Sequence, residues 1–418
     1  MEQALHVGPA FVEVAACSYE GSLFGWRVNE LVKKSSEKEE DDEVEDNDDT
    51  PGLNATMTYG FSCCQGSLKC IAVSANGKYL ATGGMSERIH IFNIKENKTL
   101  GELSGHSGAI TSLQFVEDGF LISGSEDNTI IIWNCSDWEQ VHVLGGHKGC
   151  INGIAVHPTG KLALTVSKDN TMKLWNLVLG RCAFTRRLKG PADNVKWHLS
   201  GNYYMLLVSL EVQVYLASDN SCVGTIKFKS RVNQSIFITR YDKTDALVSI
   251  CDDKCLYVHK LDGTSIAAVN ISNLGSRPKD IWSCNPSLDA LKNMELRNAL
   301  EGENECITVI TSAGRVGIFS GEALCKGDDM ESSLLTSTSV KVEPRLTAVV
   351  SWAPKNAITK VEEKGKNHPS KREEKDHPSK REEKDKGHHS RVEEKGKGAR
   401  KVDEKDTKKS KKKVKLNI

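Results

Sequence analysis

The 418-residue sequence has no long hydrophobic run, and prolines (10) and aromatics (6%) are scarce. No stretch approaches the ~20 apolar residues that a membrane-spanning helix needs. The first ten residues show no basic start followed by an apolar stretch, so we expect no secretory signal. The thirteen cysteines are odd in number and lack the regular spacing of a disulfide framework, which favours reduced thiols in the cytosol or nucleus. Membrane, secreted and disulfide-stapled proteins are therefore disfavoured.

An excess of charge of one sign is also lacking, because 56 Lys and Arg balance 56 Asp and Glu. The balance hides two blocks. Glu37–Asp49 has ten acids and one lysine (net −9), and Lys355–Ile418 has 23 Lys and Arg against 13 Asp and Glu (net +10) and repeats HPSKREEKD in tandem. Because such blocks cannot build a core, we predict a disordered acidic loop over 33–52 and a disordered lysine-rich tail over 355–418.

Between these blocks the sequence repeats itself with a period of about 41 residues. Leu80–Asn93, Leu121–Asn134 and Leu162–Asn176 align, and weaker copies follow as far as Phe319, with an insertion over 284–303. Each unit alternates short β-rich runs with turn sequences such as HPTGK and SKDN. Three or four strands in about 40 residues exclude a helical solenoid and indicate a WD-repeat β-propeller with four strands per blade.

β-rich segments remain outside the six units, which cover roughly Gly66–Leu324. These segments are Phe11–Ala16, Ser22–Val28, Ala55–Phe61 and Arg345–Trp352. Since unpaired edge strands invite aggregation, the ring must close. We predict an all-β, seven-bladed WD40 propeller over 10–354, with a closing blade of three N-terminal strands and one C-terminal strand. A six-bladed ring is the alternative. The acidic loop 33–52 would lie in a hairpin of the closing blade.

Four side chains in each of the second and third units are expected to form a buried hydrogen-bonded chain. They are the histidine of Gly-His, a Ser or Thr of the second strand, the Asp of the next turn and the Trp of the third strand. The residues are His106, Ser123, Asp127 and Trp133 in the second unit, and His147, Thr165, Asp169 and Trp175 in the third. Each net bond is worth roughly 0.5–1.5 kcal/mol. The first unit departs from this pattern, with Ser86 and Phe92 at the Asp and Trp positions. The fourth to sixth units lack a complete set, so their blades should depend mainly on apolar packing.

No catalytic or metal-binding pattern is present in the sequence. The closest cysteine pairs, Cys63-Cys64 and Cys251 with Cys255, lack a second pair at zinc-finger spacing and are interpreted as buried small hydrophobes. There is no phosphate-binding GxxxxGK[ST] loop, GxSxG elbow or HExxH motif. We therefore predict a protein that is not an enzyme, with no cofactor and no small-molecule substrate.

The end of the tail carries a lysine cluster, KKSKKKVK. Its lysines are Lys408, Lys409, Lys411, Lys412, Lys413 and Lys415. The cluster is typical of a nuclear or nucleolar signal or of a nucleic-acid patch, and a purely solubilising tail is the alternative. Lysines without interleaved aromatics contact the phosphate backbone with little sequence preference, so RNA affinity from the cluster should be weak and steeply salt-dependent.

The block His157–Phe184 (HPTGKLALTVSKDNTMKLWNLVLGRCAF) closely resembles a blade of the p21-activated kinase-interacting protein family. This is a eukaryotic group of WD-repeat proteins that includes a yeast large-subunit ribosome-assembly factor. Ala16–Trp26, Glu87–Lys95 and His106–Phe115 support the resemblance, which spans roughly 12–354. It implies a scaffold in the nucleus and nucleolus that joins precursors of the large ribosomal subunit and supports pre-ribosomal RNA processing. In animal relatives it also implies binding and restraint of a p21-activated kinase.

A third interpretation is a substrate receptor of a cullin ubiquitin ligase. Such receptors usually carry Trp-Asp-x-x-Arg or Trp-Asp-x-Arg after the third strand of a blade. Here Trp133-Asn134 and Trp175-Asn176 are followed by no arginine at either spacing, so this interpretation ranks last.

Overall fold

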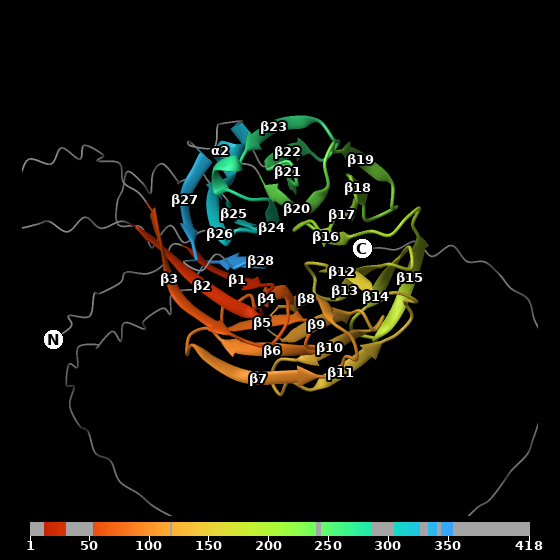
Figure 1. Cartoon of the computed structure of the whole chain (residues 1–418). Coiled ribbons are helices and arrows are strands. Elements are labelled where there is room, and N and C mark those ends of the chain that lie inside the picture. The colour runs from red at the N-terminus through yellow and green to blue at the C-terminus, as the bar shows by residue number, and fades with distance from the viewer. Residues whose placement is uncertain are drawn as a thin grey trace, which may run out of the picture. The chain divides into compact units, whose positions relative to one another are not determined.

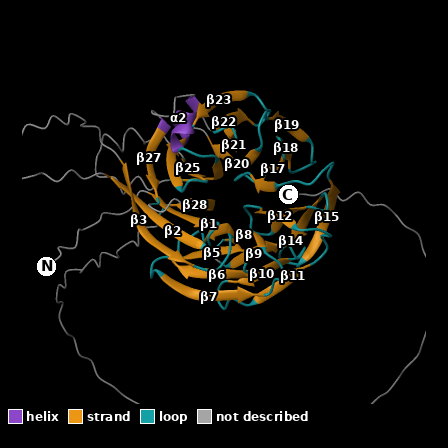
Figure 2. Ribbon diagram, in the orientation of Figure 1, coloured by secondary structure: helices purple, strands orange, loops and turns teal. Residues whose placement is uncertain are grey.

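The computed structural model describes residues 12–30, 53–117, 119–239, 244–285, 305–326, 333–340 and 344–353. Nearly all regular elements in these ranges are β-strands, as Figure 2 shows, and they form seven antiparallel four-stranded sheets. We call these sheets blades 1 to 7 and give the strands of each from the inside of the ring outward.

The strands of the first four blades are as follows. Blade 1 has β28 (Leu346–Trp352), β1 (Val12–Ser18), β2 (Ser22–Glu30) and β3 (Leu53–Ser62). Blade 2 has β4 (Leu68–Val73), β5 (Tyr79–Gly84), β6 (Arg88–Asn93) and β7 (Lys98–Ser104). Blade 3 has β8 (Ile110–Val116), β9 (Phe120–Ser125), β10 (Ile130–Asn134) and β11 (Gln140–Leu144). Blade 4 has β12 (Ile151–Val156), β13 (Leu162–Ser167), β14 (Thr171–Asn176) and β15 (Arg181–Arg187).

The other three blades follow the same plan. Blade 5 has β16 (Asn194–Trp197), β17 (Tyr203–Val208), β18 (Glu211–Leu216) and β19 (Cys222–Lys227). Blade 6 has β20 (Val232–Thr239), β21 (Asp245–Cys251), β22 (Cys255–Lys260) and β23 (Ser265–Asn270). Blade 7 has β24 (Pro278–Cys284), β25 (Cys306–Thr311), β26 (Arg315–Ser320) and β27 (Leu334–Ser339). The short helices η1 (Ser272–Leu274) and α2 (Gly321–Lys326) lie in connections.

The seven inner strands form a closed ring (Figure 1), and residues from all seven line a central channel. Each inner strand contacts the inner strands of the two neighbouring blades, including β28 with β4 and β24 with β28. The prediction of an all-β propeller with seven blades is therefore confirmed, and the six-bladed alternative is wrong.

Blade 1 closes the ring with strands from the two ends of the propeller. β28 pairs antiparallel with β1, with Glu13 opposite Trp352 and Cys17 opposite Ala348. In Figure 1 the blue β28 lies beside the red β1. Three N-terminal strands and one C-terminal strand make this blade, as the sequence predicts. The register also places the end of β2, the start of β3 and the end of β28 at the same end of the sheet.

The hydrophobic core lies mainly between neighbouring blades. β25 (CITVIT) is buried at every residue, because a second strand has a partner on each side and a blade against each face. The outer strand β15 is mostly exposed along its length. One apolar cluster, for example, joins Ile89 and Ile91 of blade 2 to Ile131 and Trp133 of blade 3. Each blade is thus stabilised by its two neighbours.

Three predicted features lie mostly outside the described residues. They are the acidic loop over 33–52, the insertion over 284–303 between β24 and β25, and the tail over 355–418 with its lysine cluster. For these segments the propeller provides only the points of attachment, and the interpretations given above stay predictions.

Candidate functional site

In blade 3 the structure brings the four expected side chains together. His106 Nδ1 lies 2.9 Å from Asp127 Oδ2, and His106 Nε2 lies 2.8 Å from Ser123 Oγ. Trp133 Nε1–H donates to Ser123 Oγ over 2.9 Å. A carboxylate only accepts hydrogen bonds, so we assign the imidazole proton to Nδ1, and Nε2 then accepts the proton of the Ser123 hydroxyl. Thr129 Oγ1–H donates to Asp127 Oδ1 over 2.6 Å and completes the chain.

Blade 4 repeats this arrangement with nearly the same distances. His147 Nδ1 lies 2.9 Å from Asp169 Oδ2, and its Nε2 lies 2.8 Å from Thr165 Oγ1. Trp175 Nε1–H donates to Thr165 Oγ1 over 2.8 Å. Thr171 Oγ1–H donates to Asp169 Oδ1 over 2.6 Å. Each blade therefore carries a continuous polar chain from a surface turn to the buried indole.

Burial sets the protonation state of the two histidines, and hydrogen bonds set that of Asp169. It lowers the pKa of His106 and of His147, so the two imidazoles are neutral at neutral pH. Burial alone would raise the pKa of Asp169, but hydrogen bonds from Thr171, the Lys148 N–H and His147 together lower it to about 2. The imidazoles are 0–1% exposed and both of their nitrogens are engaged, so neither is placed to act as a base on a substrate.

Blade 2 lacks this chain, in the way that its sequence indicates. Ser86 Oγ lies 3.4 Å from His90 Nε2, and His90 Nδ1 lies 3.3 Å from Glu102 Oε1. Phe92 is buried but carries no N–H to donate, and the buried hydroxyl of Thr82 has no hydrogen-bond partner among the described residues. Apolar packing therefore has a larger share in holding this blade.

Sequence reasoning missed a set of hydrogen bonds between blades. In four inner strands a β-bulge near the first residue lets a Thr or Asn side chain donate to a backbone carbonyl of the next blade. The donor–acceptor pairs are Thr347–Leu68 (2.7 Å), Thr111–Ile151 (2.6 Å), Asn152–Ala192 (2.8 Å) and Asn233–Pro278 (2.8 Å). The sequence did contain a hint of these bonds, because Thr111 and Asn152 are polar residues at the same position of aligned repeats.

A second chain of side chains crosses four blades at the channel. Asn194 Nδ2 donates to Gln234 Oε1 over 3.0 Å, and Gln234 Nε2 donates to Asp280 Oδ1 over 3.4 Å. The Val349 N–H donates to Asp280 Oδ2 over 2.9 Å. This chain links blades 5, 6, 7 and 1, so the polar groups of the channel also hold the ring together.

Lys196 lines the same channel as this chain. Its Nζ lies 5.1 Å from the centroid of the Trp282 ring. Burial lowers the pKa of Lys196 and raises the pKa of Asp280, while each charge favours the other. The two groups are thus an opposite-charge pair in the channel.

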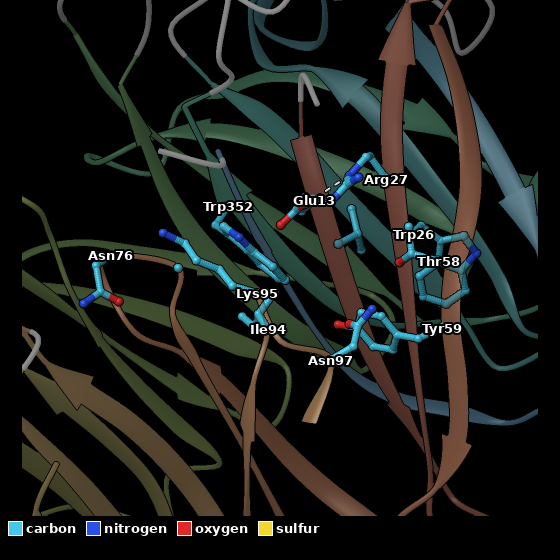
Figure 3. A pocket seen from close by; sticks show the side chains of 12 residues that line it. Glu13, Trp26, Arg27, Thr58, Tyr59, Asn76, Ile94, Lys95, Asn97 and Trp352 are labelled. Carbon is cyan, nitrogen blue, oxygen red and sulfur yellow. Dashed lines mark hydrogen bonds and ion pairs between the residues drawn. The ribbon is translucent and has the colours of Figure 1, made fainter. Parts of the chain in front are cut away.

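A hollow between blades 1 and 2 is shown in Figure 3. Polar side chains from both blades line it, among them Lys95 and the ion pair of Arg27 Nη2 with Glu13 Oε1 at 2.8 Å. Its large aromatic side chains are largely buried, since Trp352 is only 8% exposed. The hollow offers a polar rim to a binding partner and holds no arrangement of a nucleophile with an activating base.

Burial raises the thiol pKa of all four cysteines in the two close pairs. Cys251 is buried as expected, whereas Cys63, Cys64 and Cys255 are only half-buried. Burial raises the pKa of Cys63 and of Cys251 to about 12, so both thiols are protonated at neutral pH. Across the described residues no group of three or more His, Cys, Asp or Glu could hold a metal ion. No helix in the same ranges has the length and hydrophobicity to cross a membrane.

Replacement of Trp175 tests the chain in blade 4. W175A should lower the free energy of unfolding by about 3–5 kcal/mol, because it leaves a cavity in a buried site. W175F keeps most of the volume and loses one hydrogen bond, so it should cost about 1 kcal/mol, as Phe92 in the same position of blade 2 suggests. Urea denaturation of both variants measures the difference. Equal losses for W175A and W175F would contradict the cavity argument.

The buried histidines also predict a pH dependence of stability. Their pKa values lie below the ordinary 6.5 in the folded chain, so the unfolded chain binds protons first as the pH falls. Stability should therefore decrease below about pH 6.5. In thermal unfolding from about pH 7 to pH 5, H106N/H147N should show a shallower decrease than the unmodified protein. H142N, outside both chains, should keep the full slope; equal slopes in all three proteins would refute the prediction.

Comparison with known proteins identifies the repeats. The WD40 family, described as WD domain, G-beta repeat, matches residues 56–93, 97–134 and 138–176. Each match begins in the outer strand of one blade, or just before it, and ends in the third strand of the next. Each of these three repeats therefore spans two blades and links them covalently.

Curated relatives agree with the resemblance seen in the sequence. A p21-activated protein kinase-interacting protein 1-like of Gallus gallus is 35% identical over 234 residues, which are 56% of this chain and 62% of the relative. That of Xenopus laevis is 38% identical over 182 residues (44% and 49%), and Protein MAK11 of Saccharomyces cerevisiae is 34% identical over 193 residues (41% and 46%). The chain thus spans 46–62% of the length of these relatives. The chain thus carries three WD40 repeats and is similar to the p21-activated protein kinase-interacting proteins and to MAK11.

Proposed function

We propose that this protein is a non-catalytic WD-repeat scaffold for assembly of the large ribosomal subunit and processing of pre-ribosomal RNA in the nucleolus. The observation that carries the proposal is the closed seven-bladed ring. In blades 3 and 4 its His, Asp and Trp side chains are used up in hydrogen bonds within the blade and are not free for catalysis. Its turns and outer strands remain as surface for partners. The ribosomal role rests on the family that the sequence resembles, which includes a yeast large-subunit assembly factor.

The propeller and the tail have different roles in this proposal. We assign the propeller to residues 10–354 and the tail to 355–418, with Lys408–Lys415 as the nuclear and nucleolar signal. The partners would be proteins of large-subunit precursors and pre-ribosomal RNA. The fold alone would not select these partners, since propellers serve many functions.

The test is sedimentation of the tagged full-length protein in nuclear extract. We expect it to cofractionate with precursors of the large subunit, and its presence only in light fractions would count against the scaffold function. A variant with the six lysines of Lys408–Lys415 changed to Gln should lose its nucleolar signal in microscopy. The matched control changes six other tail lysines to Gln: Lys364, Lys366, Lys371, Lys375, Lys380 and Lys384. If both variants remain nucleolar, the cluster is not the signal.

The second candidate function is an adaptor that binds a p21-activated kinase and restrains it. The names of the Gallus gallus and Xenopus laevis relatives favour it, since both are p21-activated protein kinase-interacting proteins. A substrate receptor of a cullin ubiquitin ligase stays last, because no arginine follows Trp133-Asn134 or Trp175-Asn176 at the required spacing.

A kinase assay tests the adaptor function directly. The full-length protein should bind the regulatory segment of a p21-activated kinase in a pull-down and lower kinase activity as its concentration rises. Unchanged kinase activity at saturating protein would exclude restraint of the kinase, and absence of binding would exclude the adaptor altogether.

A further inference from the structure

A groove between blades 4 and 5 has cations on one wall only. Arg186, Arg187 and Lys189, at the end of β15 and just after it, form that wall. The facing wall in blade 5 is polar and mostly neutral, with Gln213 and Asn220. We call this hollow the blade 4–5 groove.

Arg186 is held in place without a carboxylate. Its guanidinium lies 4.5 Å from the centroid of the Tyr215 ring, and its Nη1 donates to the Tyr204 hydroxyl over 3.3 Å. The Tyr204 hydroxyl donates in turn to Asn220 Oδ1 over 2.9 Å. All these partners are neutral, so the guanidinium keeps its full positive charge in an ordered position.

The other cations of the groove also lack an acidic partner. Arg187 and Lys189 are exposed, and among the described residues no ion pair involves them or Arg186. Glu211, an acid of β18 in blade 5, is engaged by Lys227 at 3.5 Å and by Gln213 at 3.2 Å.

Some cations elsewhere on the ring are paired with acids. Examples are Arg27 with Glu13 (2.8 Å), Lys69 with Glu126 (2.8 Å), Arg88 with Glu102 (2.7 Å) and Arg345 with Glu20 (2.9 Å). The blade 4–5 groove differs in bringing three cations together within four residues, none of which forms an ion pair with a described residue.

Further cations extend this charge along the same side of the ring. Lys168 and Lys148 lie on turns of blade 4 that are tied together, since the Lys168 N–H donates to the Cys150 carbonyl and the Lys148 N–H to Asp169. The Leu188 N–H donates to the Asn170 carbonyl, which joins the groove to these turns.

Beyond blade 5, Lys229 and Arg231 continue the row on the connection to blade 6, where the Phe228 N–H binds the Leu210 carbonyl. Both side chains are exposed and form no ion pair with another described residue. The positive charge therefore runs over neighbouring blades at the ends of their strands, and its length suits a polyanion better than a single phosphate group.

We propose that the blade 4–5 groove binds the phosphate backbone of RNA. The choice of RNA among polyanions rests on the proposed function in ribosome assembly. Arg186 and Arg187 would contact phosphate oxygens through their guanidinium groups and Lys189 as a point charge, while Gln213 and Asn220 face the ribose side. This binding is independent of the lysine cluster in the tail and has little sequence preference.

The test compares matched charge changes on opposite sides of the ring. All proteins are full-length and carry Gln at the six lysines of Lys408–Lys415, so that the tail does not dominate binding. R187Q/K189Q removes two groove cations that are exposed, and it leaves the packed Arg186 intact. The control K98Q/K260Q removes two exposed lysines, Lys98 at the start of β7 and Lys260 at the end of β22, at the opposite ends of the strands.

Fluorescence anisotropy of a labelled single-stranded RNA of mixed sequence is measured over a range of KCl concentrations. Each lost phosphate contact should reduce the slope of log K against log salt by about 0.7, so R187Q/K189Q should reduce it by about 1.4 and weaken binding at every salt concentration. K98Q/K260Q should leave both the slope and the affinity unchanged. Equal effects of the two variants, or no effect of either, would overturn the proposal.

A phosphoserine peptide serves as a second probe. If the peptide needs Arg187 and Lys189 whereas RNA does not, the groove is a phosphopeptide site and the RNA proposal is wrong. Sedimentation of the same variants separates this inference from the proposed function. If the protein cofractionates with ribosomal precursors but its RNA binding does not need Arg187 and Lys189, only the proposal about the groove is rejected. If RNA binding needs Arg187 and Lys189 but the protein is found only in light fractions, only the scaffold function is rejected.

Discussion

The pairing of β28 with β1 is the interaction on which the rest of the molecule depends. Each blade presents apolar surface on both faces, and only a closed ring gives every face a neighbour. The two strands that close the ring are separated by more than 300 residues in the sequence. Hydrogen bonds from Thr347 to the Leu68 carbonyl and from Val349 to Asp280 secure the closing strand to the blades on either side. The fold is therefore stabilised cooperatively, because loss of one contact surface exposes two blades.

The blades reach the same shape by different chemistry. Blades 3 and 4 each use a histidine, a carboxylate, a hydroxyl and an indole in one chain. In blade 5, Tyr215 at the corresponding end of its third strand stacks on Tyr204 with ring centroids 5.3 Å apart. In blade 7 the fully buried Phe319 packs in an apolar cluster. A ring tolerates this variety because each blade needs only the right thickness and two apolar faces.

These differences explain how much could be predicted from the sequence. The Gly-His, Asp and Trp landmarks recur in fixed positions, so blades 3 and 4 and their hydrogen-bonded side chains could be located before the structure was known. The closing blade followed from the need to pair edge strands. The Asn194, Gln234 and Asp280 chain could not be predicted, because its members come from three blades and share no residue type. The blade 4–5 groove was equally hidden, since its charge depends on which acids lie nearby in space and not on any motif.

The position of β28 has a mechanical consequence. Any object held through the residues that follow Trp352 pulls on the innermost strand of the ring, which is flanked by β4 and β24. In an antiparallel pair the hydrogen bonds run perpendicular to the strands, so a force along β28 shears its bonds to β1 together instead of opening them one after another. A force applied at this end of the chain therefore acts along β28, the direction in which its pairing with β1 is most resistant to separation.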